Sequence, residues 1–286
     1  MRNFKKLIPA FLFLLLTHFQ STAQSQTDYS AADLKVFNDY LSLIERKKEL
    51  PTNELIVLSG KFFLGTPYVA HTLEKEPEQL TVNLTELDCM TFVETVLALV
   101  RTVKQGEPTF EKFCQNLQTA RYREKKITDY TDRLHYTSDW IYTNEQRGIV
   151  KDKTKAIGGK PWKLELSFMS THPDSYKQLK NNPGFIDKIA RIEKEISARE
   201  HYYIPKEEIW KYEKNIRNGD VVGFVTSVKG LDIAHVGFIV WDENGKMTFM
   251  HASSIQHEVI INPEPLQDYI NNVKSNTGIV IFRLCE

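Results

Sequence analysis

Residues 88–103 read Asp-Cys-Met-Thr-Phe-Val-Glu-Thr-Val-Leu-Ala-Leu-Val-Arg-Thr-Val and form the most strongly patterned stretch of the chain. Apolar side chains recur at helical spacing from Phe92 to Val103 on more than one side, which predicts a helix buried in the core. Cys89 stands at the head of this helix, where free backbone N–H groups and the helix dipole favour negative charge. We therefore expect a lowered pKa for Cys89 and a nucleophilic thiol, although a lone cysteine is more often only a buried side chain.

The pattern changes along the chain from helical to alternating. Helices are predicted for residues 33–48 and 53–64, ahead of the cysteine helix. After residue 216 the chain reads as short β-strands separated by Asn-Gly turns, namely 221–226, 233–241, 247–252, 259–261 and 279–284. Helices followed by an antiparallel sheet predict an α+β fold.

A long middle block, residues 107–215, separates the cysteine helix from the strands and is mostly helical or loop by pattern. We expect one domain over residues 24–286, with this block inserted into a core made of residues 54–104 and 216–286.

The first 23 residues have the order of a secretory signal. Arg2, Lys5 and Lys6 precede the apolar run 7–16, and small residues follow at 21–23. The run is shorter than the roughly 20 apolar residues of a membrane span, so an uncleaved anchor is the weaker interpretation. Cleavage would leave 34 basic and 37 acidic residues, a net charge of −3. We expect a protein exported to the periplasm or cell envelope, with no membrane span after cleavage.

Composition narrows the possible classes. The 286 residues are 41% hydrophobic and 26% charged, as in ordinary globular proteins. A net charge of zero lacks the excess of basic residues that is typical of nucleic-acid-binding proteins. Three cysteines, Cys89, Cys114 and Cys285, are too few for a disulfide scaffold and form no zinc motif. In an oxidising compartment an odd number leaves at least one thiol free. We expect no metal and no cofactor.

His235 lies in the otherwise apolar strand 233–241 and is either a core residue or a catalytic base. If Glu243-Asn244-Gly245 forms a three-residue hairpin loop with Gly245 left-handed, Asp242 lies opposite Lys246. The numbers of any two residues that face each other across this hairpin then add up to 488. His251 then lies opposite Gly237, on the same face as His235 and diagonal to it. A two-residue loop would turn His251 to the other face. The favoured register gives a Cys–His pair whose base has an orienting partner.

Five motifs occur in the order found in a known family. They are Gly65-Thr66-Pro67-Tyr68-Val69, Asp88-Cys89-Met90-Thr91-Phe92-Val93, Asn218-Gly219-Asp220-Val221, His235-Val236-Gly237-Phe238 and Met250-His251-Ala252. Over residues 54–104 and 216–286 the chain resembles the NlpC-type papain-like hydrolases, which cut amide bonds of bacterial peptidoglycan. The resemblance implies a papain-like core with the nucleophile helix packed on the sheet.

Further segments resemble a larger secreted subgroup that is N-acetylmuramoyl-L-alanine amidase-like. They are Gly230-Leu231-Asp232-Ile233-Ala234-His235, Leu134-His135-Tyr136-Thr137-Ser138-Asp139-Trp140 and Phe168-Met169-Ser170-Thr171-His172-Pro173. This resemblance implies cleavage between muramic acid and L-alanine. A γ-D-glutamyl-diamino-acid endopeptidase would use the same triad, and a non-catalytic wall-binding module is the alternative from another class. A zinc amidase would leave Cys89 without a role.

The resemblance implies a role for each matched residue. Cys89 is the nucleophile, His235 the general base and later acid, and His251 the partner that holds its tautomer. The backbone N–H of Cys89 belongs to the oxyanion hole. Tyr68 contacts the substrate or packs beneath it, and Asp88 binds an amine or caps the helix.

The insertion adds polar and aromatic residues suited to a sugar or a carboxylate. The expected substrate contacts are Tyr68, Asp88, His135, Tyr136, Trp140, Arg147, Asp232 and Ser253. The simpler alternative is that Trp140 only packs its helix onto the core.

Overall fold

The computed structural model describes residues 27–285, so the predicted signal at 1–23 lies outside the described residues. Four helices fill the N-terminal part: α1 (Ala31–Ile44), α2 (Thr52–Phe62), α3 (Cys89–Lys104) and α4 (Phe110–Arg121). The first three are the helices that apolar spacing predicts. α1 begins earlier than expected because Ser30 and Asp33 form a capping box.

An eight-stranded sheet forms the other half, and every pairing between its strands is antiparallel. Its order is β2-β3-β8-β4-β5-β6-β7, with β1 also paired to β8. The strands are β1 (Val150–Asp152), β2 (Lys160–Trp162), β3 (His201–Pro205), β4 (Val221–Thr226), β5 (Ile233–Trp241), β6 (Met247–Ser253), β7 (Glu258–Ile261) and β8 (Asn276–Leu284). The α+β prediction and all five predicted strands are confirmed.

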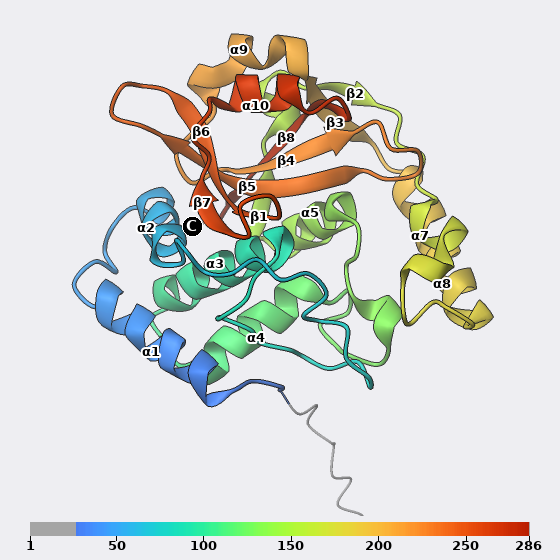
Figure 1. Cartoon of the computed structure of the whole chain (residues 1–286), viewed down its shortest axis with the longest axis horizontal. Coiled ribbons are helices and arrows are strands. Elements are labelled where there is room, and N and C mark those ends of the chain that lie inside the picture. Colours follow the sequence, from blue (N-terminus) through green and yellow to red (C-terminus); the bar gives the residue numbers. More distant parts are fainter. Residues whose placement is uncertain (1–26, 286) are drawn as a thin grey trace, which may run out of the picture.

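The two faces of the sheet carry different helices. α3 and α4 lie on one side, and α9 (Ile209–Tyr212) and α10 (Leu266–Asn272) lie on the other (Figure 1). Successive residues of a strand point to opposite faces, so Val236 and Phe238 pack in the core that contains α3. Ile239 instead packs in the core that contains α10.

The hairpin between β5 and β6 has the predicted three-residue loop. Gly245 has φ of +75°, and the N–H of Asp242 donates to the carbonyl of Lys246 at 3.0 Å. Phe238 pairs with Met250, so paired numbers sum to 488 as expected. The described pairing ends there, and the next position sets Gly237 opposite His251.

The middle block is not only helix and loop. Besides α4 and α9, its helices are α5 (Thr137–Gln146), α6 (Thr154–Ile157), α7 (Phe168–Thr171) and α8 (Pro183–Ser197), with short 3-10 turns at Tyr130–Asp132, Pro173–Ser175, Lys206–Glu208 and Glu213–Asn215. It also supplies β1, β2 and β3, which the sequence did not predict because segments of three to five residues show no clear alternation. α8 and α7 share a separate small core with Tyr136. The division into core and insertion within one domain stays a prediction.

Candidate active site

The loop from α2 to α3 places Cys89 and Tyr68 together. Tyr68 is held by main-chain bonds, its N–H donating to His257 at 2.8 Å, while the N–H of Val69 donates to Leu87 at 3.2 Å. Asp88 then caps α3: its Oδ1 accepts from the N–H of Thr91 at 2.7 Å, and its own N–H donates to Thr91 Oγ1 at 2.9 Å. The capping interpretation of Asp88 is therefore confirmed.

The thiol of Cys89 is half-buried between the start of α3 and strand β5. Backbone N–H groups of Val236, Met90 and Cys89 itself lie against the sulfur and stabilise its anion. Val236 directly follows His235, so the sulfur lies beside the peptide that carries the expected base. These N–H groups are the donors that an oxyanion formed at Cys89 would meet.

His235 and His251 form a direct pair. Nε2 of His235 lies 2.6 Å from Nδ1 of His251, and the two rings are nearly perpendicular. Phe224 and Phe249 flank the pair, with ring centroids 6.0 Å from His235 and 4.5 Å from His251. The register therefore brings the two histidines together as predicted, with Nδ1 of His235 left for another partner.

The pKa values describe a neutral resting site. Burial, with Asp88 adding to it, raises the pKa of the Cys89 thiol to about 12. The prediction of a lowered pKa is therefore wrong, because desolvation outweighs the N–H groups at the helix start. Burial also lowers the pKa of His235 to about 4 and that of His251 to about 3. At neutral pH the site holds a thiol and two uncharged imidazoles.

Three further predicted residues lie on the segments that carry Cys89 and the two histidines. Burial raises the pKa of the Tyr68 hydroxyl, and the negative charge of the Cys89 thiolate raises it further. The influence of that charge places the hydroxyl near the sulfur. Asp232, three residues before His235, is buried and accepts from the N–H groups of Ser138 and Ile233, both at 2.7 Å. Ser253 follows His251 and its hydroxyl accepts from the N–H of Gln256 at 3.1 Å. Asp232 and Ser253 thus hold the ends of the two histidine strands.

The predicted contacts from the insertion lie elsewhere. Trp140 is fully buried and its indole N–H donates to Glu94 at 3.0 Å, which leaves no surface for a substrate. Arg147 donates to the carbonyl of Thr119 in the last turn of α4 at 2.5 Å and to that of Tyr122, just after the helix, at 3.0 Å. Tyr136 is buried and donates to Glu193 at 2.6 Å, and the ring of His135 packs at a tilt against that of Tyr130 with centroids 4.3 Å apart. These four residues build the insertion.

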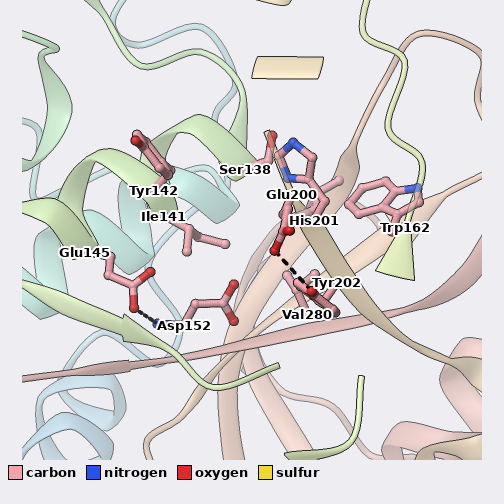
Figure 2. Close-up of a pocket in the computed structure, with 11 residues that line it drawn as sticks. Ser138, Ile141, Tyr142, Glu145, Asp152, Trp162, Glu200, His201, Tyr202 and Val280 are labelled. Carbon is pink, nitrogen blue, oxygen red and sulfur yellow. Dashed lines mark hydrogen bonds between the residues drawn. The ribbon is translucent and has the colours of Figure 1, made fainter. Parts of the chain in front are cut away.

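The opposite face of α5 lines a small cavity that sequence reasoning missed. Ser138, Ile141, Tyr142 and Glu145 face Trp162, His201 and Tyr202 across it (Figure 2). Their spacing of i, i+3, i+4 and i+7 is the signal that could have separated this face from the Trp140 face. The cavity measures about 80 Å³, room for only a few water molecules.

Tyr269 on α10 is a second residue that the sequence did not suggest. Its ring packs on Phe249 at 4.7 Å and lies 6.2 Å from His251. Burial and the Cys89 thiolate raise the pKa of its hydroxyl, which therefore lies on the side of the sulfur. No local pattern marks it, because its position depends on how α10 packs over the sheet.

Within residues 27–285 no three His, Cys, Asp or Glu side chains gather as a metal site would require.

Comparison with known proteins gives a consistent set of similarities. The model of the AmiA-like family, described as N-acetylmuramoyl-L-alanine amidase-like, matches residues 58–279. An N-acetylmuramoyl-L-alanine amidase from Bacteroides uniformis is 37% identical with a TM-score of 0.77, over 82% of this chain and 99% of that chain. Among curated proteins none matches.

Two other solved structures share the fold. A candidate xylanase from Bacteroides fragilis is 39% identical with a TM-score of 0.74, over 79% of this chain and 99% of that chain. A DUF1460 protein from Legionella pneumophila is 23% identical with a TM-score of 0.67, over 89% of this chain and 95% of that chain. At that identity the likeness extends to the fold alone.

Proposed function

The chain belongs to the AmiA-like, N-acetylmuramoyl-L-alanine amidase-like family of cell-wall hydrolases, and from that membership we propose a thiol amidase that cuts the N-acetylmuramoyl–L-alanine bond. The catalytic residues in this proposal are Cys89, His235 and His251. Its core is of the NlpC papain-like type, with the nucleophile helix packed on an antiparallel sheet.

One observation carries the proposal. The Cys89 sulfur lies against the N–H of Val236, and the imidazole of the preceding residue, His235, is bonded to His251 at 2.6 Å. Covalent catalysis needs a nucleophile, a base and a partner that orients the base. A non-catalytic wall-binding module would need none of the three.

The first half of the reaction uses His235 as a base. Its Nδ1 takes the proton of the Cys89 thiol as sulfur attacks the lactyl carbonyl carbon of muramic acid. For Nδ1 to accept, Nε2 of His235 must carry a hydrogen and donate it to Nδ1 of His251. The oxyanion then forms beside the N–H groups of Cys89 and Met90, where one donor is worth about 3 kcal/mol. The hydroxyl of Tyr68 is a further donor on that side.

In the second half of the reaction, His235 acts as an acid and gives up the proton that it took from Cys89. The protonated Nδ1 of His235 gives its proton to the amine of L-alanine as the C–N bond breaks, and the stem peptide leaves. His235 then removes a proton from water, which attacks the muramoyl thioester. Breaking the C–S bond returns the proton from His235 to Cys89 and releases the carboxylic acid of muramic acid, which then loses its remaining proton to solvent.

We place this reaction outside the cytoplasm, in the periplasm or cell envelope, on peptidoglycan or muropeptides. The signal-like segment at residues 1–23 supports export. No helix within residues 27–285 is both long and apolar enough to cross a bilayer.

A glycosidase activity, as the name of the Bacteroides fragilis protein suggests, has less support here. Glycoside hydrolysis uses two free carboxylates about 5–10 Å apart. Of the two acidic residues predicted at the site, Asp88 is engaged in capping α3 and Asp232 in binding two backbone N–H groups.

The test is mass spectrometry of a defined muropeptide after incubation with wild type, Cys89→Ser and a matched control, Cys285→Ser. We expect wild type and Cys285→Ser to release the intact stem peptide beginning with L-alanine. We expect Cys89→Ser to fold normally and release none, and His235→Ala to behave in the same way.

Two outcomes would contradict the proposal. Release by Cys89→Ser at the wild-type rate would remove the thiol from the mechanism. A shortened stem still attached to muramic acid would make the enzyme an endopeptidase instead.

A further inference from the structure

The histidine pair lies on the face of the sheet that α10 covers. Successive residues of a strand point to opposite faces, so His235 shares its face with Ile239, and His251 shares its face with Phe249. Ile239 and Phe249 both pack in the core that contains α10. On this side α10 packs against β6 and β8 (Figure 1). Whatever α10 presents to the sheet therefore meets the surroundings of the two imidazoles.

Tyr269 is the ring that α10 presents there. Leu266 and Ile270, on the same helix, are fully buried in that core. Residues at i, i+3 and i+4 of a helix share one face, so Tyr269 faces the sheet together with Leu266 and Ile270. The two buried aliphatic side chains fix the rotation of the short helix and with it the place of the tyrosine.

The ring of Tyr269 packs on both phenylalanines that flank the histidine pair. Its centroid lies 5.2 Å from that of Phe224 and 4.7 Å from that of Phe249, each nearly edge to face. Phe224 packs beside His235, and Phe249 packs beside His251. Tyr269 also lies 6.2 Å from His251 itself. Loss of this one ring would loosen the packing around both imidazoles.

One nitrogen of His251 has no polar partner. Its Nδ1 is bonded to His235, whereas its Nε2 is buried and has no hydrogen-bond partner among residues 27–285. When His235 donates to Nδ1, Nε2 must carry the hydrogen of the neutral ring. Aromatic rings tolerate such an N–H, but water would bond to it and stabilise the charged form of the ring. The arrangement of the pair therefore depends on keeping water out on this side.

Burial sets the charge of the pair. Desolvation lowers the pKa of His235, and desolvation followed by His235 lowers that of His251. Neither imidazole is paired with a carboxylate in the part of the chain that the structure describes. The other titratable groups of the site are Asp88 and Cys89 at the start of α3, Tyr68 in the loop before it, and Tyr269 on α10.

We propose that Tyr269 is a positioning residue of the active site: from α10 it closes the histidine pair to water and holds the two imidazoles in their bonded arrangement. The ring makes the contacts with Phe224, Phe249 and His251, so the ring and not the hydroxyl carries this role. The kinetic part of the test rests on the proposed amidase reaction, and the spectroscopic part does not.

The spectroscopic test compares Tyr269→Ala with Tyr269→Phe and with a matched control, Tyr212→Ala. Tyr212 is a partly buried ring of the same core on α9, without a described ring contact to the pair. Nuclear magnetic resonance of protein with 15N-labelled histidine follows each imidazole between pH 3 and 9. In Tyr269→Ala we expect the midpoints of His235 and His251 to rise by at least about one pH unit towards the ordinary value of about 6.5.

The imidazole N–H signals of the pair give a second readout in the same spectra. They should be visible in wild type, because water does not reach the pair, and lost by exchange with water in Tyr269→Ala. Tyr269→Phe and Tyr212→Ala should keep both the signals and the midpoints of wild type.

The kinetic test measures the release of stem peptide at pH 8, where both imidazoles are neutral in every variant. We expect kcat of Tyr269→Ala to fall about tenfold or more with KM within about twofold, because a displaced base lowers the rate without weakening binding. The acid limb of kcat/KM should move upwards with the spectroscopic midpoints. Tyr269→Phe should restore the rate and the limb.

Three outcomes would overturn the proposal. One is wild-type midpoints and N–H signals in folded Tyr269→Ala, or in Tyr269→Leu if circular dichroism shows the alanine variant to be unfolded. Another is a Tyr269→Phe variant as impaired as Tyr269→Ala, which would assign the role to the hydroxyl. The third is an equal shift in Tyr212→Ala, which would mean general loosening of the core. If wild type released no stem peptide, the amidase proposal would fail, and the spectra would still decide whether Tyr269 closes the pair.

Discussion

Cys89 has two opposing influences on its ionisation. The helix start and the N–H of Val236 favour the thiolate, whereas burial and the Asp88 carboxylate favour the thiol, and together they raise its pKa to about 12. The lowered pKa of His235, about 4, keeps that imidazole uncharged and able to accept a proton at neutral pH. In the mechanism that we propose, activation of the thiol therefore belongs to the attack itself, when His235 takes the proton.

This charge state predicts a broad pH profile. We expect kcat/KM to be flat across neutral pH and to fall in acid with an apparent pKa near 4, as His235 gains a proton. The rate of stem-peptide release between pH 3 and 9 measures it. The ultraviolet thiolate absorbance of wild type minus Cys89→Ser should be zero at pH 7. An acid limb near pH 6 to 7, or a thiolate signal, would mean a charged thiolate–imidazolium pair.

Gly237 matters because β5 and β6 approach closely there. A Cβ at this position would lie 2.7 Å from the carbonyl oxygen of Met250 and 3.1 Å from Cβ of His251. Only glycine lets His251 come within 2.6 Å of His235 at this register.

Gly237→Ala should therefore impair catalysis more than folding. Forcing the strands apart displaces His251 from His235, and a shift of about 1 Å can lower the rate on the order of 100-fold. Steady-state kinetics and circular dichroism would measure both. Gly245→Ala is the control: nothing lies within 4 Å of its Cβ, so it should change stability through its left-handed φ and leave kcat unchanged. Equal kinetics for both variants would contradict the steric argument.

At the scale of elements, a buried ion pair joins α3 to α4 and α5. Nε of Arg121 donates to Glu94 at 2.7 Å with both side chains 3% exposed, and the indole of Trp140 donates to the other carboxylate oxygen. Arg121 also donates to the carbonyl of Thr81 at 2.7 Å. Glu94 thereby ties α3, the helix that begins at Cys89, to the insertion.

Glu94→Ala should destabilise the fold by about 3–5 kcal/mol, because it leaves the Arg121 charge buried without its partner. Denaturant unfolding followed by circular dichroism measures the change. Glu195→Ala, on the exposed side of α8, should stay within about 0.5 kcal/mol of wild type. A loss below about 1 kcal/mol for Glu94→Ala would show that Arg121 finds water or another acceptor.

Elements differ in how far local sequence predicted them. The 243–245 loop, with glycine third, predicted the β5–β6 register and so the histidine pair. No helix bounds are predicted for α5, and Trp140 is expected to contact the substrate or, in the alternative, to pack its helix onto the core. The structure has the alternative: Trp140 packs inward and Tyr142 is exposed. A helical pattern of mixed aromatic and polar residues does not say which face meets the core when both carry rings.

At the scale of the whole molecule, three imidazoles within residues 27–285 are held without charge by desolvation. The pKa of His135 is lowered to about 3 by burial and Arg133, and those of His235 and His251 are lowered by burial. Unfolded histidine binds protons near pH 6.5, and these three do so only near pH 3 to 4. Between those values the unfolded state holds more protons, so stability falls as pH falls.

The free energy of unfolding should therefore be level above about pH 6.5 and decrease towards pH 4. Asp152 and Asp232, whose pKa values are raised by burial, oppose this trend at the acid end. His135→Gln should reduce the slope by up to about 1.4 kcal/mol per pH unit without touching the histidine pair. Urea unfolding at several pH values measures it. An identical slope for wild type and variant would show that His135 is protonated in the fold.

Short-range patterns were enough to predict the α+β class, the cysteine at a helix start and the partner of His235. Helical spacing, a capping aspartate and a hairpin glycine act over a few residues, so they can be read without knowing the rest of the chain. The ionisation of Cys89, the burial of Trp140, the strands of the insertion and the place of Tyr269 depend on distant segments packing together. Desolvation and long-range contact exist only in the folded chain, which is why the sequence placed Cys89 at a helix start and the tertiary structure set its charge and its surroundings.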